Sequence, residues 1–209
     1  YGIIFKLGKN FNNIILHENF IQVGASILDI NLSKFAEINN IKNFEFFSGI
    51  PGSIGGAVKM NAGCFGFETN DSLIDIKTIN SEGEFCSLNK EELKLTYRNS
   101  DLPDRNIIVS ANFSYSLGDK DEIKHKINQI KIMREKSQPL KSKTSGSTFK
   151  NPKNNFAAKL IEMSECKGLN VGDIFVSSKH ANFLINSNQG TSSQIEELGK
   201  IIIDKVYKK

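Results

Sequence analysis

The chain has 209 residues, of which 39% are hydrophobic and 24% are charged, the balance of a globular protein with a substantial core. No apolar run approaches the roughly 18 residues that a membrane-spanning helix needs, and no charged segment followed by a long apolar one marks a secretory signal. The net charge of +4 is too small to indicate nucleic-acid binding, so we expect neither a nucleic-acid partner nor a membrane partner.

The first part of the chain alternates between short apolar runs and turn residues, which predicts strands with few helices. In the pair of strands over 75–88, the stretch "NSEG" has the composition of a hairpin turn. A helix is predicted over 28–40, where apolar residues recur near helical spacing, and a short one begins at residue 89. The expected strands cover residues 2–7, 12–18, 20–26, 75–88 and 106–117.

Helices are more prominent in the second part of the chain. Isoleucines at helical spacing predict a helix over 119–134, and another over 155–168 is expected to close at Gly168. Strands are predicted at 173–178 and 181–187, and Thr191 or Ser192 is expected to cap a final amphipathic helix. The pattern predicts an α+β chain and leaves two positions open for the domain boundary, near residues 70–80 or near residues 115–120. We place it after residue 115, giving domains 1–115 and 116–209.

Metal and disulfide chemistry find no support in the residue pattern. Cys64, Cys86 and Cys166 are odd in number and widely spaced, which favours reduced thiols in a cytoplasmic protein. His180 has no second ligand at a useful spacing. We therefore expect no metal site.

The stretch Ser48–Gly63, "SGIPGSIGGAVKMNAG", holds five glycines in sixteen residues. Glycine reaches positive φ angles and lets a ligand approach main-chain N–H groups, which suits a phosphate cradle. The spacing matches neither the P-loop nor the dinucleotide-binding fingerprint. A connection made of tight turns and a cradle for a pyrophosphate are equally compatible with this composition.

Five motifs in series resemble those of one enzyme family. They are "GIPGSIGGAVKMNAGCFGFETND", "YRNSDLP", "REKSQP", "SGSTFKNP" and "LIEMSECKGLNVGDIFVSSKHANFLIN". In this order they resemble the UDP-N-acetylenolpyruvoylglucosamine reductase family, also called the UDP-N-acetylmuramate dehydrogenase or MurB family, over nearly the whole chain. The resemblance implies an α+β flavoprotein with part of a split FAD-binding domain of the vanillyl-alcohol-oxidase (PCMH) type in residues 1–115. Residues 116–209 would form an α+β substrate-binding domain.

The resemblance also implies an activity and its location. NADPH would reduce FAD, and the enolpyruvyl group of a UDP-sugar would then be reduced to give UDP-N-acetylmuramate for peptidoglycan synthesis. Such an enzyme serves cell-wall biogenesis, cell shape and cell division from the cytoplasm. We expect a monomer whose partners are the UDP-sugar and NADPH.

By the same resemblance, each site residue receives a role. Arg98 would hold the substrate carboxylate and stabilise the enolate, since a guanidinium suits a planar carboxylate, and Ser147 would be the proton donor. Taken alone, Arg98 is typical of a surface salt bridge and Ser147 of a turn. The implied substrate-binding residues are Tyr97, Lys150 and Asn151. The implied FAD-binding residues are Gly49, Ile50, Pro51, Gly52, Ser53, Gly55, Gly56, Asn61, Ala62, Gly63 and Arg134, although Arg134 also suits the C-terminal end of a helix as a cation.

Two parts of the family pattern have no counterpart in this sequence. One is an earlier glycine-serine-asparagine turn that also grips the FAD, and the other is a glutamate beyond the last helix. We therefore expect a chain truncated at both ends. The alternative function is a non-catalytic remnant that keeps the fold and binds a nucleotide or a partner.

Overall fold

The computed structural model describes residues 4–209, which divide into two compact units, Tyr1–Ile132 and Met133–Lys209. The division lies inside the long helix α4 (Lys120–Ser137), later in the chain than residue 115. The side chain of Asp119 begins α4, because its Oδ1 accepts hydrogen bonds from the N–H groups of Asp121 and Glu122, both at 2.9 Å.

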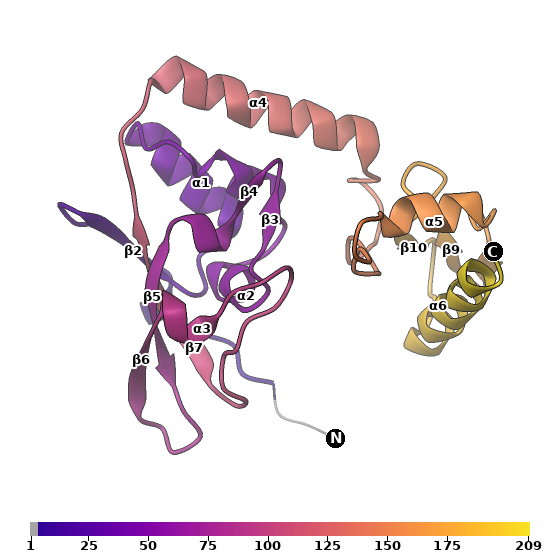
Figure 1. Cartoon of the computed structure of the whole chain (residues 1–209), viewed down its shortest axis with the longest axis horizontal. Coiled ribbons are helices and arrows are strands. Elements are labelled where there is room, and N and C mark those ends of the chain that lie inside the picture. The colour runs from indigo at the N-terminus through magenta and orange to yellow at the C-terminus, as the bar shows by residue number, and fades with distance from the viewer. Residues whose placement is uncertain (1–3) are drawn as a thin grey trace. The chain divides into compact units, whose positions relative to one another are not determined.

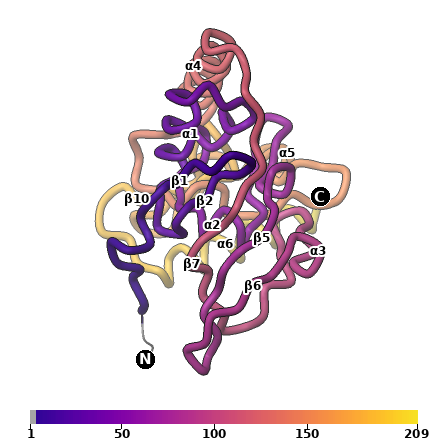
Figure 2. The backbone as a smooth tube through the Cα atoms, turned by 90° about the vertical axis from the view of Figure 1, so that its left-hand side faces the viewer, coloured from indigo at the N-terminus to yellow at the C-terminus, as the bar shows by residue number. Residues whose placement is uncertain are grey.

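An antiparallel five-stranded sheet organises the first unit, with the strand order β1-β2-β7-β5-β6. The β5–β6 hairpin extends beyond the rest of the sheet in both views (Figure 1 and Figure 2). Asn80 forms its turn by accepting N–H bonds from Glu82 and Glu84, and Gly83 adopts a φ of +83°. The strands are β1 (Ile14–Leu16), β2 (Phe20–Gly24), β5 (Leu73–Ile79), β6 (Phe85–Asn89) and β7 (Ile107–Ser114).

The core of this unit lies where the short helices pack on the central strand β7. Ala111 of β7 pairs with Val23 of β2 and Ile76 of β5, and all three side chains are buried. Phe113 meets Phe44 and Phe47 edge-on, with ring centroids 6.0 and 6.1 Å apart. Figure 1 shows α1 and α2 on the same side of the sheet. The smaller elements are η1 (Lys9–Phe11), α1 (Asp29–Ile38), η2 (Glu45–Gly49), α2 (Ile54–Lys59), β3 (Gly63–Cys64), β4 (Phe67–Glu68), η3 (Thr69–Asp71) and α3 (Lys90–Leu93).

The second unit packs two helices against a small antiparallel sheet of order β10-β9-β8. Leu198 and Ile202 of α6 are buried against Ile174 and Val176 of β9 and against Ile161 of α5. This apolar stripe at i and i+4 is the reason an amphipathic helix forms here. The elements are α5 (Ala157–Met163), β8 (Asn170–Val171), β9 (Ile174–Val176), β10 (Leu184–Asn186) and α6 (Ser192–Tyr207).

The α+β class and most predicted elements are confirmed. Of the two candidate caps of α6, the structure selects Thr191, whose Oγ1 accepts the N–H of Gln194 while Gln194 Oε1 accepts the N–H of Thr191. The strand predicted over residues 2–7 is wrong for the residues that the structure describes, because residues 4–8 lie outside any helix or strand. Its first two residues lie outside the described part of the chain.

The predicted end of the helix over 155–168 is also wrong. Helix α5 ends at Met163, because Glu165 takes a φ of +55° and the N–H of the buried Cys166 bonds the carbonyl of Ile161. This is the Schellman arrangement with a glutamate in place of the usual glycine. Gly168, also at positive φ, belongs to the following turn.

The structure adds three general findings. No disulfide joins Cys64, Cys86 and Cys166 within residues 4–209. No helix within residues 4–209 is long and apolar enough to cross a membrane. The same residues contain no group of three or more His, Cys, Asp or Glu side chains that could hold a metal ion.

Candidate functional site

Part of the glycine-rich segment is helical, which the sequence did not predict. Gly55 and Gly56 lie inside helix α2, and none of the five glycines between Ser48 and Gly63 has a positive φ. A Cβ on Gly52 would lie 2.9 Å from Asp29 Oδ2, and one on Gly63 would lie 2.5 Å from the carbonyl oxygen of Phe67. Glycine is therefore required at these two positions because other atoms of the same chain lie too close for a side chain, and not because of the backbone conformation.

Gly56 is the exception, because a Cβ there would meet nothing closer than Ser53 Oγ at 4.0 Å. It lines a cavity of about 620 Å³ together with Ser53 and Gly55. Lys6, Lys59, Arg105 and Asp104 also line this first cavity, which gives three cations against one carboxylate. Open glycine backbone among an excess of cations suits an anionic group such as a diphosphate.

Arg98 connects the predicted substrate residues to the glycine-rich segment. Thr96 and Asn99 exchange two main-chain hydrogen bonds, so Tyr97 and Arg98 form the tip of a tight turn. Arg98 has a φ of +53° there, a conformation that costs a non-glycine residue on the order of 1 kcal/mol or more. Its Nη1 donates to the carbonyl of Asn61 at 2.9 Å and its Nη2 to that of Gly63 at 2.6 Å. The two predicted elements, 35 or more residues apart in the chain, are thus directly bonded.

Asn61 holds the other side of this junction. Its side chain is fully buried, with Nδ2 donating to the carbonyl of Thr96 at 3.1 Å and Oδ1 accepting the N–H of Asn70 at 3.0 Å. Asn61 therefore contacts the turn of Arg98 through both its amide and its main-chain carbonyl. Its side-chain amide thus joins that turn to Asn70 of η3.

A second cavity, of about 400 Å³, opens at this junction. It is lined by Arg98 and Tyr97 together with Gly63, Cys64 and Glu68. The guanidinium carbon of Arg98 lies 5.0 Å from the centre of the Tyr97 ring, a cation–π distance. A guanidinium held in place by two carbonyls at the wall of a cavity suits the binding of a carboxylate.

Ser147 lies in the second unit, on the loop between α4 and α5. It pairs with Phe183 in an isolated antiparallel bridge, and its side chain is exposed. Thr148 donates its N–H to the carbonyl of Asn182 at 2.8 Å. Gly146, at a φ of +91°, turns the chain just before the serine.

The other predicted residues of this unit have contacts of their own. Asn151 Oδ1 accepts the N–H of Ala157 at 3.0 Å, at the start of α5. Lys150 lines a largely apolar cavity of about 310 Å³ formed with α5 and α6. Arg134 Nε donates to Gln138 Oε1 at 3.1 Å at the C-terminal end of α4, where a cation favours the helix dipole.

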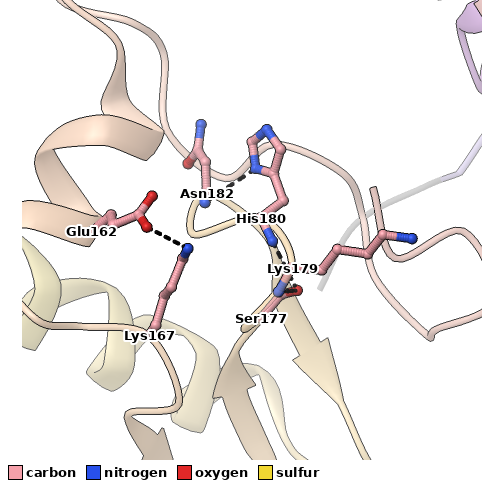
Figure 3. A network of polar contacts seen from close by, with 6 residues as sticks. All are labelled: Glu162, Lys167, Ser177, Lys179, His180 and Asn182. Atoms are coloured by element: carbon pink, nitrogen blue, oxygen red, sulfur yellow. Dashed lines mark hydrogen bonds and ion pairs between the residues drawn. The ribbon is translucent and has the colours of Figure 1, made fainter. Parts of the chain in front are cut away.

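A polar network braces the turn between β9 and β10 (Figure 3). Ser177 Oγ accepts the N–H groups of Lys179 and His180 at 3.1 and 3.2 Å, and His180 Nδ1 accepts the N–H of Asn182 at 3.3 Å. Burial lowers the pKa of His180, an effect that its backbone hydrogen bond opposes. A lowered pKa favours the neutral ring, which alone can accept a hydrogen bond at Nδ1. In the same view, Lys167 and Glu162 form an ion pair at 2.6 Å.

Known proteins are similar to this chain in sequence and in fold. The family model for the C-terminal domain of UDP-N-acetylenolpyruvoylglucosamine reductase matches residues 138–209. The UDP-N-acetylenolpyruvoylglucosamine reductase of Rickettsia conorii is 41% identical over 205 residues, which are 98% of this chain and 70% of that protein. This chain belongs to the UDP-N-acetylenolpyruvoylglucosamine reductase family.

Further similarities agree with this assignment. The reductase of Rickettsia typhi is 40% identical over 206 residues, covering 99% of this chain and 70% of that protein. The crystal structure of the reductase (MurB) from Thermus caldophilus matches with a TM-score of 0.88 and 33% identity, over 95% of this chain and 73% of that one. The predicted family is confirmed, and with it the class of enzyme, an oxidoreductase.

Sequence reasoning missed two residues that the structure places beside the predicted ones of this reductase family. Asp29 is fully buried at the start of α1, beside Gly52, and neither of its carboxylate oxygens has a hydrogen-bond partner among the described residues. Burial raises its pKa from 3.8 to about 7. Asn182, on the loop before β10, bonds the chain next to Ser147. An aspartate in the first turn of a predicted helix is typical of a solvated position, so no sequence signal indicates the burial of Asp29.

Proposed function

We propose that this chain is a flavin-dependent reductase that uses NADPH to convert UDP-N-acetylglucosamine-enolpyruvate into UDP-N-acetylmuramate in peptidoglycan synthesis. The observation that supports this most is the pair of hydrogen bonds from Arg98 to Asn61 and Gly63. They join the residue expected to bind the substrate carboxylate to the segment expected to bind the flavin. Family membership supplies the class of substrate, as the names of the relatives give it.

The first cavity fits the anionic part of FAD. Its open Gly56 backbone leaves room for a diphosphate, and Lys59 and Arg105 supply compensating charge. Ser53, Gly55 and Gly56 would therefore hold FAD, together with the rest of the predicted segment from Gly49 to Gly63 and with Arg134. Bound FAD would supply hydride transfer from NADPH to the substrate.

The residues of the chain would bind the substrate and control charge and protons. Reduction of the enolpyruvyl C=C bond adds a hydride to one carbon and a proton to the other. Arg98 would hold the carboxylate and stabilise the negative charge that the hydride creates, since a charge-assisted pair is strongest where charge develops. Ser147 would donate the proton. A hydroxyl is a weak acid, but a carbanionic centre is basic enough to take its proton when the two groups are held in place.

The remaining predicted residues would recognise the nucleotide. Tyr97 and Asn151 would contact the substrate, and Lys150, with Lys141 and Lys143 earlier in the same loop, would supply positive charge for phosphates of the UDP-sugar or NADPH. We also propose that the enzyme is monomeric and works in the cytoplasm, with these two small molecules as its partners.

Titration of the purified chain with FAD tests the proposal. We expect a visible flavin spectrum that remains after gel filtration and bleaches when NADPH is added without oxygen. Ser147→Ala is expected to keep both properties and to slow reoxidation by the enolpyruvyl substrate by orders of magnitude. Colourless protein that resists reconstitution with FAD would refute the proposed activity and favour a non-catalytic protein.

A further inference from the structure

Asn182 clamps the chain immediately after Ser147. Its side chain is only 3% exposed, and both ends of its amide are used by one residue. Oδ1 accepts the N–H of Phe149 at 2.9 Å, and Nδ2 donates to the carbonyl of Phe149 at 2.8 Å. Its main-chain carbonyl accepts the N–H of Thr148 at 2.8 Å. Three hydrogen bonds from one residue therefore fix the two residues that follow the serine.

The clamp is itself held rigidly. Figure 3 shows the main chain of Asn182 bonded to the ring of His180, while its side-chain amide lies apart from that ring. The N–H of Ser177 bonds the carbonyl of Phe183 at 2.9 Å, and the N–H of Phe183 bonds the carbonyl of His180 at 3.0 Å. Ser177, 1% exposed, orients two more N–H groups of this turn. The side-chain amide of Asn182 thus extends from a tight turn that these hydrogen bonds hold in place.

Ser147 itself lies on a long loop without regular secondary structure. The chain between Ser137 and Ala157 is fully described and contains no helix or strand. Besides the bridge between Ser147 and Phe183, the N–H of Asn186 in β10 bonds the carbonyl of Lys143 in this loop. Gly146 directly precedes the serine and gives the backbone freedom. The position of the hydroxyl thus depends on the contacts with Asn182 and Phe183.

We propose that Asn182 is a positioning residue that holds Ser147 in place for proton donation. The proposal rests on the proposed function, since it assumes that Ser147 is the donor. A weak acid such as a hydroxyl donates its proton only from a fixed geometry, and a displacement of about 1 Å costs on the order of 100-fold in rate. Asn182 acts through Phe149 and Thr148 and touches no reacting atom.

The test compares the two half-reactions of the FAD-loaded full chain in Asn182→Ala and in a matched control, Asn186→Ala. The control also removes amide bonds to main chain, those with Asn188 and Gly190, in the turn that follows β10. We expect Asn182→Ala to slow substrate-dependent reoxidation about 10- to 100-fold, with substrate affinity and flavin reduction by NADPH unchanged. Asn186→Ala is expected to keep the wild-type rates.

Two further variants separate positioning from general damage to the fold. Asn182→Asp still accepts from Phe149 N–H, but only its protonated form can donate to the Phe149 carbonyl. Its rate relative to wild type is therefore expected to rise as the pH falls. Adding Asn182→Ala to Ser147→Ala is expected to change the remaining rate by less than about twofold, because the positioned group is already gone. An equal slowing in both backgrounds, or equal slowing of flavin reduction, overturns the proposal.

Amide hydrogen exchange distinguishes failure of the inference from failure of the proposed function. Asn182→Ala is expected to lose protection at Thr148 and Phe149 while α5 and α6 keep theirs. If the wild-type chain binds no flavin, the proposed function is refuted and the catalytic part of the inference falls with it. The exchange data still test whether Asn182 holds this loop. Unchanged protection at the amides of Thr148 and Phe149 would show that it does not.

Discussion

The buried carboxyl of Asp29 provides the sharpest test of the first unit. Its side chain is fully buried against Gly52, has no hydrogen-bond partner among the described residues, and has a pKa raised by burial to about 7. The folded state therefore holds a proton that the unfolded state releases at pH values above about 3.8. Stability should fall as the pH rises from about 4 to about 7, because the folded state binds more protons throughout this interval.

The size of the effect follows from the two pKa values. A shift from 3.8 to about 7 corresponds to about 4 kcal/mol once the pH exceeds both values, at about 1.4 kcal/mol per unit. Asn has the same shape as Asp and carries no charge at any pH. Asp29→Asn should therefore be more stable than wild type by about 4 kcal/mol at pH 8, but by only about 2 kcal/mol at pH 5.

Urea denaturation between pH 5 and pH 8 measures this difference directly. All other titrating groups are common to both proteins, so the difference between their free energies of unfolding isolates Asp29. Glu91→Gln, which neutralises an exposed carboxylate on α3, is the matched control and should follow the wild-type profile within about 0.5 kcal/mol. Parallel profiles for Asp29→Asn and wild type would show that the carboxyl is solvated, and the reasoning would be wrong.

Three further substitutions test the glycine segment and the second unit. Gly63→Ala forces a methyl group to within 2.5 Å of the Phe67 carbonyl and should destabilise the first unit by about 2 kcal/mol in urea denaturation; wild-type stability would contradict the close approach. Gly56→Ala has open space at its Cβ and should stabilise α2 by about 0.5 kcal/mol. It should nevertheless weaken FAD binding about tenfold in a fluorescence titration. Unchanged affinity would show that the first cavity is not the flavin site. Thr191→Ala should lower the stability of the second unit by about 1 kcal/mol through loss of the α6 cap, and Ser192→Ala should not; equal effects would refute the assignment of Thr191.

The sequence predicted most of the local structure, because the period of its apolar residues is strong. Helices α1, α4 and α6 and the hairpin of β5 and β6 lie where apolar spacing and turn chemistry placed them. Where the prediction was wrong, tertiary packing had overridden local signals. Burial of Cys166 ends α5 before Gly168, and glycines that local chemistry assigns to turns lie in helix α2.

The candidate site was predicted by residue identity but not by its connections. The motif resemblance selected Arg98 and the glycine segment separately, whereas their hydrogen bonds depend on the turn at Tyr97 and on the buried Asn61. The crowding at Gly52 comes from Asp29, 23 residues earlier in the chain, and the crowding at Gly63 comes from Phe67 across the hairpin of β3 and β4. The role of Asn182 could not be predicted, because its partner Phe149 is 33 residues away in the chain.

The central claim, that this chain reduces an enolpyruvyl UDP-sugar, is tested most directly by one mixing experiment. The wild-type chain is loaded with FAD, reduced with one equivalent of NADPH in the absence of oxygen, and mixed with UDP-N-acetylglucosamine-enolpyruvate while flavin absorbance is recorded. We expect full return of oxidised flavin with one equivalent of UDP-N-acetylmuramate formed. Flavin that stays reduced until oxygen is admitted, with no product formed, would contradict it.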